Sequence, residues 1–222
     1  MIVGMSYKKV AEMSTRMNRA EMGVATPTSF QNKKTYFEFL SHFETRNLEK
    51  IKAGVLNHFD ASAKVNASHP INEAAQGIGY YSDIILPIIQ SLDGFTRQNY
   101  IVLGGEYQGT EWVTSTGYFY GHFIKPIFGI PPSNKMAFLR FGEFHKMENG
   151  KIVETHVYLG LAELIIALGL WPLSPNKGYE GLVPGPATHD GVLIESSDPL
   201  ASRASGDLVE GIKIQDDKFI SE

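Results

Sequence analysis

Residues 136–159, with the sequence MAFLRFGEFHKMENGKIVETHVYL, decide the fold, because two β-branched and aromatic runs flank the turn-forming pair Asn149-Gly150. Such a hairpin can take two registers. A two-residue turn pairs Glu148 with Lys151 and mixes charged and apolar side chains on both faces. A three-residue loop, with Gly150 as a left-handed bulge, pairs Met147 with Lys151 instead. We choose the three-residue loop, because it separates the charged face from the apolar one.

In this register one face of the hairpin is mostly apolar, and it carries Leu139, Phe141, Glu143, His145, Met147, Val153, Thr155, Val157 and Leu159. Glu143 is then a carboxyl group among apolar neighbours, beside His145. Burial raises the pKa of an unpaired carboxyl, so Glu143 is expected to stay protonated and to donate a hydrogen bond. A carboxylate that reaches a neighbouring arginine or the sheet rim fits the pattern equally well. His145 fits a packed, hydrogen-bonded core position as well as a catalytic one.

The pattern on both sides of this hairpin predicts an α+β domain. Helical spacing marks residues 30–49, 51–59, 74–92 (with a kink at Pro87) and 161–168, and strand patterns mark 96–103, 111–123, 136–147 and 152–159. We expect the four strands to form a mostly antiparallel sheet, with the helices on one face. Residues 1–29 are expected to form an N-terminal arm, 30–173 the domain, and 174–222 a Pro/Gly-rich extension.

Composition excludes several classes of protein. The 222 residues contain no cysteine, which removes disulfide scaffolds, thiolate metal sites and cysteine nucleophiles. Twenty basic and 24 acidic side chains give a net charge of −4, so nucleic acid is not an expected partner. We find no membrane span and no secretory signal, and we expect a cytoplasmic protein. No metal-ligand spacing or phosphate-binding loop is present, so no metal and no cofactor are expected.

Residues 30–173 resemble the SnoaL-like polyketide cyclases, which form a branch of the nuclear transport factor 2-like superfamily. The resemblance rests on the hairpin and on motifs at Asn47-Leu48-Glu49, His69-Pro70, Ser115-Thr116-Gly117, Gly129-Ile130-Pro131-Pro132 and Leu168-Gly169-Leu170-Trp171-Pro172. It implies a cone-shaped, curved antiparallel sheet wrapped by helices around one pocket, as in a cystatin-like α+β barrel. It also implies a homodimer formed through the outer sheet face, where Phe144 and Tyr158 would need cover.

The same resemblance implies roles for three residues. Glu143 stands where the related ketosteroid isomerases carry a protonated acid, a case among the standard examples of pKa tuning. His69 stands where those enzymes place the general base, and His145 would be a second donor. Two departures weaken the match, since Phe39 replaces a hydroxyl donor and Gly160 replaces an acidic residue.

The expected ligand is a small hydrophobic molecule. The side chains expected to line its pocket are Phe39, Trp112, Thr116, Tyr118, Phe141, Thr155 and Val157. The first functional hypothesis is cofactor-free acid/base chemistry, either aldol cyclisation or isomerisation, on a carbonyl substrate. The alternatives are a non-catalytic small-molecule-binding protein of the same fold and a dimerisation module.

Overall fold

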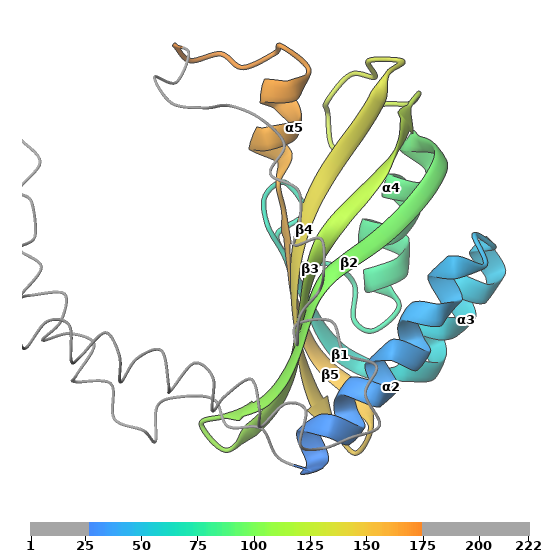
Figure 1. The fold of residues 1–222 in the computed structure, drawn as a ribbon, viewed down its shortest axis with the longest axis vertical. Coiled ribbons are helices and arrows are strands. Elements are labelled where there is room, and N and C mark those ends of the chain that lie inside the picture. Colours follow the sequence, from blue (N-terminus) through green and yellow to red (C-terminus); the bar gives the residue numbers. More distant parts are fainter. Residues whose placement is uncertain (1–26, 175–222) are drawn as a thin grey trace, which may run out of the picture.

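The computed structural model describes residues 27–174, which form two layers of helix and sheet (Figure 1). Helix α2 (Pro27–Glu44) is followed by α3 (Leu48–His58), and a π-helical turn, η2 (Tyr80–Ile85), runs directly into α4 (Leu86–Ser91). The strands are β1 (Phe59–Ala67), β2 (Leu92–Tyr107), β3 (Thr110–Phe123), β4 (Met136–Glu148) and β5 (Lys151–Leu159), before the final helix α5 (Leu161–Ala167).

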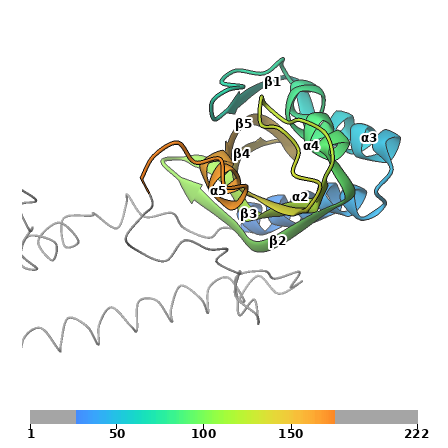
Figure 2. The ribbon, with the colours of Figure 1, turned by 90° about the horizontal axis from the view of Figure 1, so that it is seen from above.

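The five strands form one curved sheet in the order β1-β5-β4-β3-β2. Neighbouring strands are antiparallel except β1, which pairs in parallel with β5. Viewed from above, the strands curve around a central space, and α3 and α4 lie between the two edge strands (Figure 2). The α+β class and the cone-shaped sheet are therefore confirmed. The sheet is mixed, and it is not closed into a barrel.

The helices differ from expectation at their ends. Helix α3 begins after Asn47, whose side chain accepts a hydrogen bond from the Lys50 amide, as the cap residue Asn commonly does. The expected third helix starts only at Tyr80, and its kink near Pro87 is the junction between η2 and α4. A π-helical turn has no simple sequence signature, so the helical spacing could not predict it.

The hairpin turn was predicted wrongly, but its faces were predicted correctly. Asn149 and Gly150 both have positive φ (50° and 73°) in a two-residue turn, and Glu148 pairs with Lys151. The register then shifts at Val153, so that beyond it His145 pairs with Thr155 and Glu143 with Val157. The three-residue loop would have paired His145 with Val153 and Glu143 with Thr155, which keeps the same side chains of β4 on the inner face. The extra residue of the hairpin is therefore Val153, in a bulge within β5, and not Gly150 in the turn. Its local effect is that Ile152, rather than Val153, is buried.

The core lies inside the cone, between the concave face of the sheet and the helices. Helix α2 supplies Tyr36, Phe39 and Phe43, and the strands supply apolar side chains from each inward position. None of the helices between residues 27 and 174 has the length and apolar character that a membrane span requires. The expected N-terminal arm and C-terminal extension fall almost entirely outside the described residues, and the domain limits stay a prediction.

Candidate functional site

A polar cluster inside the cone is centred on the carboxylate of Glu143; we call it the interior network. Arg97 on β2 donates to both carboxylate oxygens, at 2.6 and 3.3 Å. Tyr80 on η2 donates at 2.7 Å and Tyr36 on α2 at 3.1 Å. His145, two residues along β4, lies 3.3 Å away through its Nε2 atom. The exposed fractions of the Arg97 and Glu143 side chains are 1% and 0%, so the ion pair is buried.

Three further polar side chains, those of Thr155, Ser115 and Asn99, contact these five residues. Thr155 Oγ1 lies 2.7 Å from His145 Nδ1. Ser115 Oγ lies 2.7 Å from the Tyr36 hydroxyl. Asn99 Oδ1 accepts a hydrogen bond from Arg97 Nε at 3.0 Å. The strand register explains this convergence. Ser115 is the cross-strand partner of Glu143 and Thr155 that of His145, and inward-facing partners share one face of the sheet.

The charge state of Glu143 is the opposite of the expected one. Burial alone would raise its pKa, but the Arg97 guanidinium and the hydrogen bonds from His145 and Arg97 outweigh burial and hold that pKa well below its usual range. The prediction of a protonated Glu143 was therefore wrong, and the alternative of a carboxylate paired with an arginine is correct. Burial raises the pKa of both Tyr36 and Tyr80, which stay protonated donors.

Aromatic rings surround the Arg97 guanidinium of the interior network. The Arg97 guanidinium lies 4.4 Å from the ring centre of Phe141, 4.9 Å from that of Phe43 and 5.3 Å from that of Phe119. Phe95 stacks on Phe119 at 5.8 Å. These contacts stabilise the buried cation by cation–π attraction and surround it with apolar surface.

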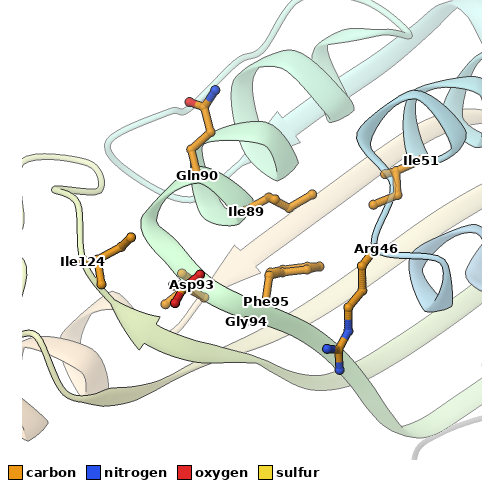
Figure 3. A pocket seen from close by; sticks show the side chains of 9 residues that line it. Arg46, Ile51, Ile89, Gln90, Asp93, Gly94, Phe95 and Ile124 are labelled. Carbon is orange, nitrogen blue, oxygen red and sulfur yellow. The ribbon is translucent and has the colours of Figure 1, made fainter.

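A pocket with a volume of about 340 Å³ opens at the wide end of the cone, and we call it the mouth pocket (Figure 3). It is lined by Arg46, Ile51, Ile89, Gln90, Leu92, Asp93, Gly94, Phe95 and Ile124. These residues come from the α2–α3 link, α3, α4, β2 and the segment after β3. The volume lies in the range of small-molecule sites, toward its lower end.

Irregular backbone shapes one wall of the mouth pocket. The pairing of β2 with β3 is interrupted between Asp93 and Thr96, and Gly94 has a φ of +69°. Arg46 also has a positive φ, of +50°, and its Nη2 atom donates to Thr96 Oγ1 at 3.0 Å. Bulges and left-handed non-glycine residues are concentrated at functional sites, which favours this pocket as the ligand site.

The expected site residues fall into three groups. Glu143, His145, Phe39, Phe141, Thr155 and Val157 are all buried on the inside of the cone, as predicted. None of them lines the mouth pocket. His69 is exposed in the turn after β1, and within residues 27–174 no hydrogen bond joins it to Glu143. The structure therefore brings together only two of the three expected catalytic residues.

The third group, Trp112, Thr116 and Tyr118, lies on the outer face of the sheet. Thr116 pairs with Gly142 and Tyr118 with Arg140, both outward positions of β4. The expectation that these three side chains line the interior was wrong, because the inward positions of β3 are the alternate ones, Ser115 among them. Thr116 instead borders a shallow outer groove of about 280 Å³ over Gly142.

Sequence reasoning missed most of the polar side chains that matter. Tyr36 and Tyr80 fall at apolar positions of the helical spacing in 30–49 and 74–92, which indicates burial but not the hydrogen-bond partner that a phenol buried in a core usually needs. Arg97 was also missed, and its place on the same strand face as Phe95 was the available signal. No group of three or more His, Cys, Asp or Glu residues within 27–174 is arranged to hold a metal ion.

No family model matches the sequence, and no curated protein matches it either. Solved structures do share the fold. A proposed SnoaL-like polyketide cyclase from Jannaschia sp. CCS1 aligns with a TM-score of 0.51 and 15% identity, over 68% of this chain and 97% of that chain. AclR, a proposed hydroxylase from Streptomyces galilaeus, aligns with a TM-score of 0.51 and 14% identity, over 66% and 90% of the two chains. At these identities the likeness establishes the fold.

Proposed function

Because the chain has the fold of a SnoaL-like polyketide cyclase, we propose that it binds a small, mostly apolar molecule in the mouth pocket. The observation that carries this proposal is the separation of the pocket from the interior network. The pocket has a suitable volume and apolar walls, whereas the carboxylate below it is already satisfied. An ion-paired Glu143 is a weak base and has no proton to donate near pH 7.

Binding can be tested with 2-naphthamide, a neutral bicyclic probe, by NMR titration of the full chain. At about 0.3 kcal/mol per non-hydrogen atom, a ligand of roughly 13 such atoms would have a Kd near 1 mM, within reach of this method. Ile89→Trp, which fills the pocket, should abolish the shifts. Leu56→Trp, an exposed position of α3, should leave them unchanged. Equal binding by both variants would overturn the proposal.

A second candidate is the acid/base chemistry of a polyketide cyclase. It is favoured by the chain of contacts from Thr155 through His145 to Glu143 inside the cone, next to two phenols. Such a site would act only if Phe95 and its neighbours moved aside to admit a carbonyl substrate. The exposed position of His69 would also have to be reconciled with its expected role as the general base.

This candidate has its own test, the exchange of the α-proton of 1-(2-naphthyl)butane-1,3-dione for deuterium. Catalysis by the interior network predicts faster exchange with the protein, and its loss in His145→Gln. A role for His69 as general base predicts a similar loss in His69→Gln. No acceleration by the unmodified protein would rule the candidate out.

We also propose that a second copy of the chain covers the outer sheet face. Phe144 and Tyr158 are 44% and 56% exposed there and pack edge to face at 6.0 Å. The same face carries Lys146 and Glu154, which are cross-strand partners and lie 2.9 Å from Glu148 and 3.0 Å from His156, respectively, so a second copy would meet a face of mixed charge. A patch of this kind is typical of a protein interface.

A further inference from the structure

The polar groups of the mouth pocket lie at its rim, and the apolar ones lie deeper. Ile51 is fully buried, and the exposed fractions of Leu92 and Phe95 are 5% and 6%. The side chains of Arg46, Gln90 and Asp93 are exposed, and they come from three of the segments that line the pocket (Figure 3). A ligand that matches this gradient has an apolar body at the bottom and a polar head at the rim.

The rim carries one charge of each sign. Arg46 uses one guanidinium nitrogen on Thr96 and keeps further N–H groups for a ligand. The side chains of Asp93 and Gln90 make no hydrogen bond or ion pair with any other residue between 27 and 174. Together the three groups offer donors from Arg46, acceptors from Asp93 and both from Gln90.

The geometry points to a ligand with a neutral polar head, which bears both a hydrogen-bond donor and an acceptor and faces the mouth, away from Glu143 and His145. A carbonyl oxygen would accept from Arg46, and a hydroxyl or amide N–H of the same head would donate to Asp93. An anionic head would be attracted by Arg46 but repelled by Asp93, and a cationic head the reverse, so neither ion gains a net attraction that offsets the loss of its hydration. This inference rests on the proposed function, because it assumes that the mouth pocket holds the ligand.

Three probes that share one bicyclic body test the charge preference: 2-naphthamide, 2-naphthoate and 2-naphthylmethylammonium. We expect the unmodified protein to bind the neutral amide about tenfold more tightly than either ion. Asp93→Asn should raise the affinity for naphthoate and lower that for the ammonium probe. Arg46→Gln should do the reverse. Glu106→Gln and Lys34→Gln remove the same charges far from the pocket and should change neither preference.

The outcomes separate the two proposals. If all three probes bind with equal affinity, and neither rim variant changes their order, the neutral-head inference is overturned while binding in the mouth pocket stands. The inference is also overturned if His145→Gln, rather than the rim variants, changes the order of the probes. If none of the three probes binds to the unmodified protein, the proposed function fails and the inference falls with it.

Discussion

Glu143 is the residue on which the interior of the molecule depends. Arg97 is 1% exposed, so replacing Glu143 with Gln leaves a buried guanidinium without its counter-charge. Removing one partner of a buried ion pair typically costs about 3–5 kcal/mol, and we expect Glu143→Gln to lower the free energy of unfolding by this amount. Urea denaturation monitored by circular dichroism measures it.

The control is Glu163→Gln, which breaks a more exposed ion pair with Arg140, whose two side chains are 34% and 31% exposed. Partly exposed pairs of this kind contribute about 1 kcal/mol or less. If Glu143→Gln proves no more destabilising than Glu163→Gln, Glu143 does not have the structural role assigned to it.

The ion pair of Glu143 also determines how the free energy of unfolding depends on pH. The pKa of Glu143 is lower in the folded chain than in the unfolded one, because Arg97 pairs with the carboxylate. Its stabilising contribution is therefore complete above the unfolded pKa of about 4.3 and is lost as the pH falls further toward the folded pKa. The difference in unfolding free energy between the unmodified protein and Glu143→Gln should shrink between pH 5 and pH 3. A constant difference over that range would contradict the charge state.

The hairpin shows how far the sequence predicts an element of this protein. Alternation along residues 136–159 correctly placed Glu143 and His145 on the inner face. It could not locate the bulge, since an extra residue at Val153 or in the turn produces nearly the same faces. Helical spacing likewise could not show that Tyr80 points its hydroxyl at Glu143, because that depends on the π-helical turn and on tertiary contacts.

The close approach of strands β2 and β3 makes Gly117 sensitive to substitution. A Cβ atom there would lie 2.0 Å from the Gln98 carbonyl oxygen, a backbone atom that cannot move aside. We expect Gly117→Ala to cost about 1–3 kcal/mol in thermal or chemical unfolding. Gly142→Ala, on the next strand, meets nothing within 4 Å and should stay within about 0.5 kcal/mol. Equal effects of the two would show that β2 and β3 are not packed this closely.

The exposed aromatic pair Phe144 and Tyr158 predicts that two copies of the chain associate into a dimer. We expect sedimentation equilibrium to give twice the mass of the chain, and we expect Phe144→Lys with Tyr158→Lys to give the mass of one chain. Two positive charges in each copy would repel across a twofold contact. Leu56→Lys, at an exposed apolar position of α3, is the matched control and should leave the dimer intact. A monomer for the unmodified chain would refute the proposed interface.

The sequence could predict the class of fold because alternation and helical spacing report which side chains face the core. It could not predict the mouth pocket, which is assembled from five separate segments and depends on an interrupted β2–β3 pairing. For the same reason, the sequence points to Glu143 and His145, whose faces follow from the alternation in the hairpin, and does not point to Arg46, Asp93 and Phe95.

We propose that a ligand binds above the interior network and leaves that network intact. A crystal structure of the protein soaked with 2-naphthamide tests it most directly. We predict ligand density between Ile51, Ile89 and Phe95, with the Arg97–Glu143 ion pair still in place. Density for the ligand inside the cone, in contact with Glu143 and displacing Arg97 from it, would contradict this account.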